Sequence, residues 1–318
     1  MMVATSRKKC PVTYSEVPPF FSLVDYRNNY FTSDDPNKII EFYNGFENRD
    51  QLIQWMRERP KGVTSIHEVE GDKEIIVVIP TADFNGKYAK ECRDNIFKGL
   101  HMIFVESGEV PDPYFNYAHN CNVGIKKAME YQPKWVLVSN DDMYKIDNVE
   151  VLRAELSQLG DADIVYTAES TYHSSPMQII VPNHLFFLYL RLTSYGNEYV
   201  SICRRFNIRY FPIGVNLIKS LVFKSHLKYV ELQSFMIIST NYIERERYTI
   251  FDEVFINQAE DTDLSLKIKM SGVKNMKINY EIGNYVGSTF GINNGRRLRS
   301  LASLIYLGAK WGEKLVDT

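Results

Sequence analysis

The chain has 318 residues, of which 45% are hydrophobic, and its formal net charge is -2. A chain of this length and apolar content can bury a sizeable core, as one large domain or two smaller ones. The charge provides no basic field for a nucleic-acid backbone, so we expect no nucleic-acid partner.

The cysteines and the apolar stretches bear on the cellular compartment. The cysteines have no C-x-x-C spacing and no histidine at ligand spacing, which indicates neither a zinc site nor a disulfide framework and favours a reducing cytoplasm. They are Cys10, Cys92, Cys121 and Cys203. The N-terminus lacks the apolar stretch of a signal peptide, and the apolar tract at 179–190 is interrupted and too short to span a bilayer. We expect a cytoplasmic protein that could still touch a membrane surface.

Residues 1–72 are predicted to form an N-terminal extension without chemistry of its own. Asp35 and Pro36 stand in the order typical of a helix start, and an apolar face follows them. A second helix is expected at residues 50–58, because Pro60 stops its pattern.

From Lys73 onward the pattern changes to alternating strands and helices. The expected strands are residues 75–79, 102–105, 135–138 and 163–166. The helices between them are expected at residues 85–99 and 116–131 and after the cap-like pair Asp147 and Glu150. Right-handed crossovers would make residues 73–168 a parallel, doubly wound half-sheet, which is a nucleotide-binding architecture.

Residues 135–143, WVLVSNDDM, contain the third of these strands and the polar residues that follow it. An apolar run passes directly into Ser139, Asn140, Asp141 and Asp142, as in a buried parallel strand whose carboxyl end opens into a polar site. Adjacent carboxylates there suggest a divalent cation and a phosphate-bearing ligand. The motif is equally typical of a turn or a helix cap, where Asn and Asp are favoured for local hydrogen bonds.

The half-sheet has no glycine-rich phosphate loop of either common type. Without the backbone cradle of such a loop, carboxylates at strand ends would have to act on phosphates through a bridging metal ion.

The second half of the chain is harder to interpret. Residues 169–232 are treated as an insertion of unclear role, since their histidines do not stand at metal-ligand spacing. Residues 233–295 begin with a short apolar strand at 235–239, and Glu260, Asp261 and Asp263 then stand at a predicted helix start, where acids are also ordinary dipole partners. Residues 296–318 predict an amphipathic basic helix, which caps a core more often than it binds lipid.

Taken together and in their order, five stretches resemble an inverting glycosyltransferase of the GT-A fold, similar to glycosyltransferase family 2. They are VVIPTADFNG (77–86), VESGE (105–109), FNYAHNCNVGIKKA (115–128), SNDDM (139–143) and FDEVFINQAEDTDLSLKIKMSG (251–272). The resemblance covers residues 75–295 and implies an α/β fold, with a Rossmann-like, mostly parallel sheet flanked by helices, an N-terminal extension and a C-terminal helix.

The resemblance also implies roles for individual residues. Contacts to the nucleotide fall on Pro80, Thr81, Asp83, Glu106, Asn116, Asn120 and Asp141. Asp142 would bind Mg²⁺ or Mn²⁺ bridging the donor diphosphate, and Asp261, after Glu260, would be the general base. Many relatives have a metal-binding histidine where Asn284 stands here, which leaves Asp142 as the implied protein ligand.

The implied reaction moves a sugar from a UDP or GDP donor to a hydroxyl of a glycan, a lipid-linked or a protein acceptor, with inversion. A sugar-phosphate nucleotidyltransferase is an alternative, although that class usually has a glycine-rich opening loop. Two carboxylate sites would also suit a glycoside hydrolase. A catalytically inactive GT-A-like binding module is a further alternative, because a fold does not establish activity. The oligomeric state is left open.

Overall fold

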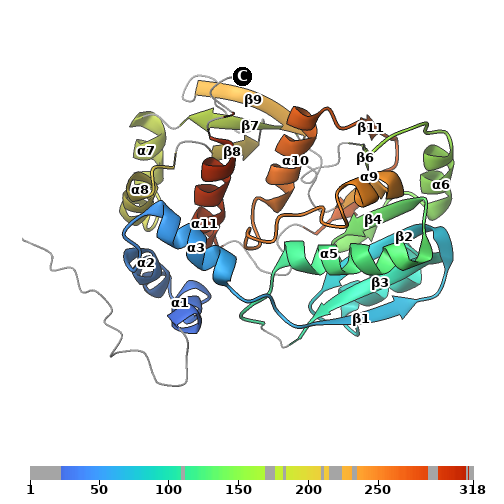
Figure 1. The fold of residues 1–318 in the computed structure, drawn as a ribbon, viewed down its shortest axis with the longest axis horizontal. Coiled ribbons are helices and arrows are strands. Elements are labelled where there is room, and N and C mark those ends of the chain that lie inside the picture. The colour runs from blue at the N-terminus through green and yellow to red at the C-terminus, as the bar shows by residue number, and fades with distance from the viewer. Residues whose placement is uncertain are drawn as a thin grey trace, which may run out of the picture.

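The computed structural model describes residues 23–108, 112–168, 176–181, 184–208, 211–214, 224–230, 235–285, 293–312 and 314. At its centre is a seven-stranded sheet in the order β1-β3-β2-β4-β10-β6-β11 (Figure 1). The strands are β1 (Thr64–Val69), β2 (Asp72–Thr81), β3 (Leu100–Ser107), β4 (Trp135–Ser139), β6 (Ile164–Tyr166), β10 (Phe235–Ser239) and β11 (Asn275–Lys277). The fold is therefore α/β, with a mixed sheet flanked by helices.

The strand directions differ in one respect from the expected half-sheet. β3, β2 and β4 are parallel neighbours, as predicted, but β10 lies between β4 and β6 and is antiparallel to both. β4 and β6 therefore point the same way without touching. The contiguous parallel half-sheet predicted for residues 73–168 was wrong at this point, because β10 comes from a distant stretch and local periodicity carries no information about strand order.

Helices cover both faces of the sheet, and the buried side chains of β2 point alternately to one face and to the other. Ile75, Val77 and Ile79 pack on one face, with α4 (Lys87–Glu91), a π-helical turn (Cys92–Ile96) and α6 (Val149–Ser157). Ile76 and Val78 pack on the other face, with α5 (Tyr117–Ala128), α9 (Thr240–Arg245) and α10 (Glu260–Ser271). The helix expected at residues 85–99 is confirmed as a shorter, unbroken helical segment, α4 with the π-helical turn, and the one expected at 116–131 is confirmed as α5 and a 3-10 turn (Met129–Tyr131).

The start of α6 departs from the expected capping. Asn148, and not Asp147, is the residue before the helix, and its side chain makes no capping hydrogen bond. Asp147 instead accepts a hydrogen bond from the backbone N–H of Glu281 at 2.8 Å. The carboxylate therefore joins two distant segments, which a local capping pattern could not reveal.

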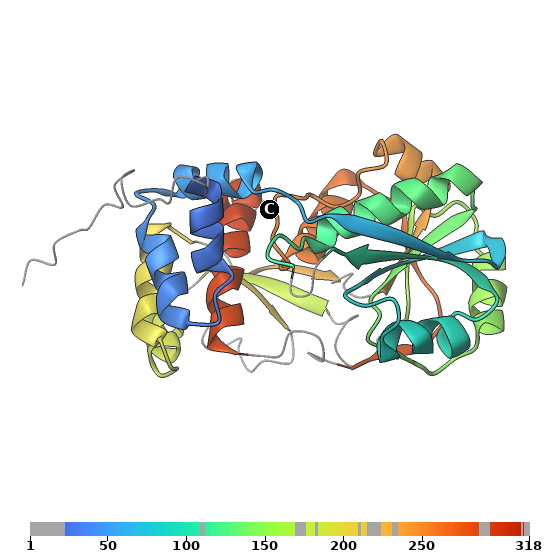
Figure 2. The same ribbon diagram turned by 90° about the horizontal axis from the view of Figure 1, so that it is seen from below.

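A separate helical cluster lies at one end of the molecule, beside the sheet (Figure 2). It contains α1 (Leu23–Phe31), α2 (Pro36–Asn44), α3 (Arg49–Glu58), α7 (His184–Arg191), α8 (Gly196–Arg205) and α11 (Asn294–Trp311). The predicted start of α2 is confirmed, since the Asp35 side chain accepts from the N–H of Asn37 and Pro36 is the first helical residue. The expected extension is not only helical, because β1 pairs with β3 at the edge of the sheet.

The remaining strands form two small sheets. β7 (Pro176–Val181), β8 (Phe211–Gly214) and β9 (Lys224–Val230) pair in the order β8-β7-β9, within the segment for which no role was assigned. β5 (Met143–Lys145) pairs with β12 (Ile282–Asn284), directly after the Asp141–Asp142 motif. None of the helices in the described ranges has both the length and the apolar character needed to cross a membrane.

Candidate functional site

The carboxyl ends of β2 and β4 bring together Thr81 and Asp141. These strands are parallel and paired, with Val78 opposite Val138. Thr81 is the last residue of β2, and its hydroxyl donates a hydrogen bond to Asp141 Oδ2 at 2.7 Å. The contact joins residues 60 positions apart, as the prediction of polar side chains at a common sheet edge requires.

The Asp141 carboxylate has a disturbed acidity. Burial raises its pKa to about 6, the negative charge of Asp142 adds to this effect, and the hydrogen bond from Thr81 opposes it. Asp141 therefore titrates close to neutral pH, as side chains at functional sites often do.

Asp142 is fixed by a strand from a distant part of the chain. Only 6% of the residue is exposed, and its Oδ1 accepts a hydrogen bond from Asn284 Nδ2 at 2.8 Å. Asn284 lies on β12, opposite Met143 of β5, and the following N–H, that of Tyr285, donates to the Asp142 carbonyl at 2.8 Å. The asparagine at the position of the relatives' histidine thus contacts the carboxylate expected to bind metal.

Close packing lets β12 reach this position. Gly283 lies against the ring of Tyr144, and a Cβ atom added at Gly283 would stand 1.9 Å from Tyr144 Cζ. No larger residue fits there without moving one of the paired strands.

The donor set around Asp142 fits a magnesium-like ion bound partly by substrate. The negative charge of Asp142 adds to the effect of burial on the pKa of Asp141, and a bound cation would offset both. Mg²⁺ typically takes one or two protein carboxylates and completes its shell with phosphate oxygens and water. Among the described residues, no group of three or more His, Cys, Asp or Glu side chains could hold a metal ion by itself. A cation at Asp142 would therefore need further ligands from water or from a bound substrate.

Glu106 uses both carboxylate oxygens within the protein. One accepts from the N–H of Phe84 at 2.9 Å, and the other lies 2.7 Å from Nε2 of His67 on β1. His67 also stacks on the Phe84 ring, with the centroids 4.4 Å apart. In this arrangement Glu106, predicted to contact the nucleotide, holds the loop after β2 against the edge strand.

The other predicted nucleotide contacts lie in or near the same sheet edge. Pro80 is buried within β2, opposite Val105 of β3. Asp83 is exposed in the loop after β2, and its carboxylate accepts from the N–H of Asn85 at 2.8 Å. Asn120 is buried on α5, where its amide donates to the Ser107 hydroxyl at 3.4 Å. Of the three, Asp83 is the side chain that solvent and a ligand can reach.

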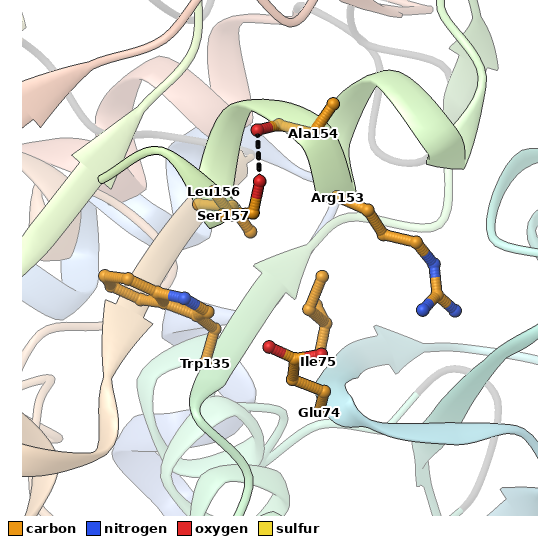
Figure 3. Close-up of a pocket in the computed structure, with 7 residues that line it drawn as sticks. All are labelled: Glu74, Ile75, Trp135, Arg153, Ala154, Leu156 and Ser157. Atoms are coloured by element: carbon orange, nitrogen blue, oxygen red, sulfur yellow. Dashed lines mark hydrogen bonds between the residues drawn. The ribbon is translucent and has the colours of Figure 1, made fainter. Parts of the chain in front are cut away.

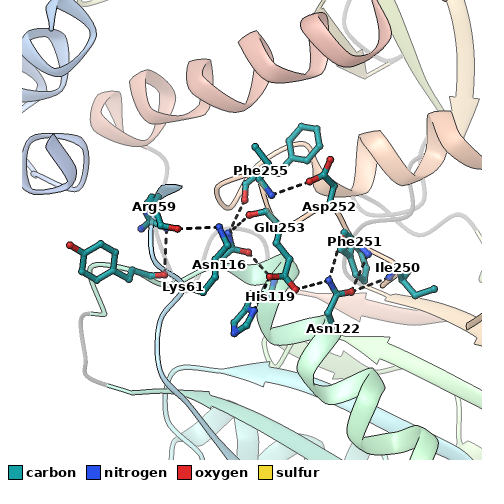
Figure 4. Close-up of polar contacts among 12 residues, drawn as sticks. Arg59, Lys61, Asn116, His119, Asn122, Ile250, Phe251, Asp252, Glu253 and Phe255 are labelled. Atoms are coloured by element: carbon teal, nitrogen blue, oxygen red, sulfur yellow. Dashed lines mark hydrogen bonds and ion pairs between the residues drawn. The ribbon is translucent and has the colours of Figure 1, made fainter. Parts of the chain in front are cut away.

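Asn116 connects the start of α5 to the loop at residues 250–259 (Figure 4). Its Nδ2 donates to the carbonyls of Glu253 and Phe255 at 3.0 and 2.9 Å. Its Oδ1 accepts from the N–H of His119, so the side chain also caps the helix. Asn116 is fully buried and its amide is committed to this loop in the structure.

Two further asparagines hold the same loop and were not singled out in the sequence. Asn122 accepts from the N–H groups of Ile250 and Phe251 and donates to the Phe251 carbonyl and to Glu253 (Figure 4). Asn257 accepts from the N–H of Tyr117 at 2.8 Å. The available signal was Asn122 on the apolar side of a predicted helix, where a polar residue must find buried partners.

The loop ends in the acid pair Glu260 and Asp261. Ala259 before them has φ +68°, a left-handed conformation that is uncommon for a residue with a side chain. Glu260 is 8% exposed, and its Oε2 is buried with no hydrogen-bond partner in the described part of the chain. Burial and the charge of Asp261 raise the pKa of Glu260 well above its usual range, while Arg296 opposes the shift. Asp261 is half-buried and accepts from the N–H of Thr262 at 2.7 Å.

The acid pair lies beside the start of α5. Burial is the main reason why the pKa of Tyr117 lies well above its usual range, and the charges of Glu260 and Asp261 add to it. α5 follows the carboxyl end of β3, where Asn120 contacts Ser107. The acid pair therefore lies near the helix start that follows the carboxyl end of β3, and Asp141 lies at the carboxyl ends of the neighbouring β2 and β4.

A pocket of about 310 Å³ lies at the opposite, amino edge of the sheet (Figure 3). It is lined by Glu74, Ile75, Trp135, Arg153, Ala154, Leu156 and Ser157. Glu74 and Ile75 stand at the start of β2, and Arg153 belongs to α6. This pocket contains none of the predicted site residues, so it is separate from both acid clusters.

No protein-family model and no curated protein matches this chain. The interpretation of the site therefore depends on the chemistry and positions of its own residues.

Proposed function

We propose that this chain is an inverting glycosyltransferase of the GT-A type, which moves a sugar from a nucleotide-diphosphate donor to an acceptor hydroxyl. The proposal depends on one observation: Asp141 contacts Thr81 at the carboxyl end of β2, and the Glu260–Asp261 pair lies near Tyr117 at the start of α5, which follows the carboxyl end of β3. Ligands of open α/β sheets bind at the carboxyl ends of the strands. Sugar transfer needs a carboxylate to accept the hydroxyl proton and, elsewhere, positive charge for the departing diphosphate.

In this proposal the two members of each pair have different roles. Asp261 accepts the proton of the acceptor hydroxyl, because it is half-buried and has the more exposed carboxylate of its pair. Burial and the charge of Asp261 raise the pKa of Glu260, which disfavours Glu260 as the ionised member of the pair. Asp142 holds Mg²⁺ or Mn²⁺, which when bound neutralises charge on the diphosphate of a UDP or GDP donor.

The loop and strand ends around Asp142 would receive the nucleoside. Thr81 orients Asp141 through its 2.7 Å hydrogen bond, and Asp83 is exposed beside it. Glu106 and Asn116 support this site from behind, since their polar atoms are bonded to the two loops that carry Asp83 and the acid pair.

The test is a donor screen followed by two variants. The protein is incubated with UDP- and GDP-sugars and Mn²⁺ or Mg²⁺, and both donor binding and release of nucleoside diphosphate are measured. Asp261→Asn should keep donor binding and lower turnover by about 10² to 10⁴-fold. Asp142→Ala should lose metal-dependent donor binding. Glu150→Gln, an exposed acid in the first turn of α6, is the matched control and should change neither.

Other outcomes identify the alternatives. Unchanged turnover in both acid variants would contradict the assignment. Formation of pyrophosphate from a sugar phosphate and a nucleoside triphosphate would indicate nucleotidyl transfer instead. Metal-dependent donor binding without turnover, with every acceptor tried and with water, would indicate an inactive binding module.

A further inference from the structure

The outer face of α7 carries large apolar side chains that the proposed reaction does not use. Leu185 and Leu188 are each 54% exposed, Tyr189 is 56% exposed, and Leu192 in the turn that follows is 80% exposed. Their spacing of three, four and seven residues from Leu185 places them along one stripe of a helix. A contiguous exposed apolar stripe of this kind marks an interaction surface more often than isolated exposed residues do.

The opposite side of α7 is anchored in the protein. Phe186 is 5% exposed within the helical cluster, and Phe187 and Leu190 pack against the same core. The helix is therefore apolar on two sides, of which only one is buried by the described residues. α7 lies on the outside of the helical end of the molecule, away from the sheet (Figure 1).

Exposed arginines lie to one side of this stripe. Arg191 is exposed at the end of α7, and Arg204 and Arg205 are exposed on α8, where Arg205 also donates to the Tyr43 carbonyl at 3.1 Å. The Arg204 guanidinium lies 5.4 Å from the centroid of the Phe187 ring, which places it beside α7. Glu198 is the only acid in residues 184–208. The surface therefore pairs apolar side chains with a positively charged flank.

We propose that this surface, α7 with Leu192 and the neighbouring arginines of α8, docks on an anionic lipid bilayer. An amphipathic helix with apolar side chains on one side and basic residues beside them binds at the level of the lipid headgroups. The leucines protrude from a helix and are more than half exposed, so they can insert between headgroups, and Tyr189 has an apolar ring with a polar tip suited to that depth.

A second copy of the chain is a less suitable occupant. A two-fold dimer through this face would bring the positively charged flanks of two copies into one interface, and like charges repel. The tail helix, for which lipid contact was considered in the sequence, is also unsuitable. Its apolar residues are already buried, with Leu298 0% and Leu301 3% exposed.

The test is sedimentation of the full chain with vesicles. We expect it to bind vesicles of phosphatidylcholine with about one third phosphatidylserine, to bind pure phosphatidylcholine vesicles less, and to dissociate as salt is raised. The double variant Leu188→Asp, Leu192→Asp should bind at least roughly tenfold more weakly, because it places charge in the apolar stripe. Its thermal unfolding should match the parent, since both sites are exposed.

Val63→Asp is the matched control, because Val63 is 76% exposed at the start of the sheet region and far along the chain from α7. It should leave vesicle binding unchanged. Equal binding by the parent and the double variant, or no binding by the parent, would overturn the proposal. A parent that forms a dimer which the double variant loses, with no vesicle binding by either, would assign the face to self-association instead. The outcome does not depend on whether the chain transfers sugars.

Discussion

The two acid clusters are positioned in different ways. Asp141 and Asp142 follow β4, whose backbone is bonded to β2 on one side and to β10 on the other. Glu260 and Asp261 follow an irregular loop, in which Ala259 has positive φ and the backbone is held by side chains of α5. Regular strand pairing thus places the first cluster, whereas individual buried side chains place the second. Substitution of single buried polar side chains should therefore disturb the loop at residues 250–259 more than the strand end that carries Asp141 and Asp142.

The strongest test of this difference is Asn122→Ala. The change leaves the N–H groups of Ile250 and Phe251 buried without their acceptor and removes the bonds to Phe251 and Glu253. Unsatisfied buried groups of this kind cost about 1–3 kcal/mol each, so we expect a loss of about 3 kcal/mol or more in the free energy of unfolding. Chemical denaturation measures it.

Asn95→Ala is the control for that experiment, because Asn95 is exposed and its side chain bonds, among the described residues, to Glu91 on its own helical segment. It should change the free energy of unfolding by less than about 0.5 kcal/mol. If Asn122→Ala is equally mild, the loop does not depend on α5 and the contrast between the clusters fails.

Lys310→Met should have a smaller but clear effect. Lys310 of α11 donates to Asp252 in the loop at 2.7 Å and to the buried Asp263 of α10 at 2.8 Å. The variant leaves two carboxylates without their cation. We expect a loss of about 2–3 kcal/mol in the free energy of unfolding, which is less than for a fully buried pair because the Lys310 side chain is 31% exposed. Thermal or urea unfolding measures it.

Two comparisons define the Lys310 result. Lys38→Met, at an exposed position of α2, should be nearly neutral. Lys310→Met combined with Asp263→Asn should be less harmful than the sum of the two single changes, because the second change removes one of the unpaired charges. Strict additivity would show that the ion pair does not hold α11 to α10.

The smallest effect is expected at Asp141, in the pH dependence of the free energy of unfolding. The pKa of Asp141 is about 6 in the folded chain, above its usual value, so the folded state holds this proton more tightly than the unfolded state does. The protonated Asp141 carboxyl therefore contributes fully to the free energy of unfolding below about pH 4, and this contribution is lost as pH rises through 6. The parent should therefore lose on the order of 1 kcal/mol relative to Asp141→Asn between these limits.

Denaturation of both proteins at several pH values measures this difference. Thr81→Val should extend the loss to higher pH, because the hydrogen bond from Thr81 lowers the pKa of Asp141. A parent and an Asp141→Asn variant with parallel pH profiles would show that the carboxylate is not perturbed. Donor and Mn²⁺ binding should reverse the sign at neutral pH, since both favour the ionised form.

The sequence predicted the polar end of β4 and its approach to β2 for a physical reason. An apolar run that ends in polar residues marks both the buried strand and its carboxyl end, so the approach of Thr81 to Asp141 follows from strand position alone. The helix starts at Pro36 and Glu260 were equally visible, because capping residues and acids act within one turn.

The parts that could not be predicted depend on contacts between distant segments. β10 lies between β4 and β6, and β1 pairs with β3. Local sequence patterns do not predict this strand order. The position of Asn122 on the apolar side of a helix indicates buried partners, but only its bonds to a segment over a hundred residues away show which partners these are. Asn257 has no such signal, and its role appears only in its bond to Tyr117. Glu106 likewise has a strand-end position that suits a ligand, but its oxygens bond to His67 and Phe84.

The hydrogen bond to Asp142 depends on Gly283, a residue without a side chain that lies against the Tyr144 ring. Asn284 can reach the carboxylate because the preceding residue allows β12 to lie flat on β5. A methyl group there would lift the strand and withdraw the amide, leaving every acid in the sequence unchanged. We therefore expect substitutions at Gly283 to be tolerated as poorly as substitutions at the carboxylates.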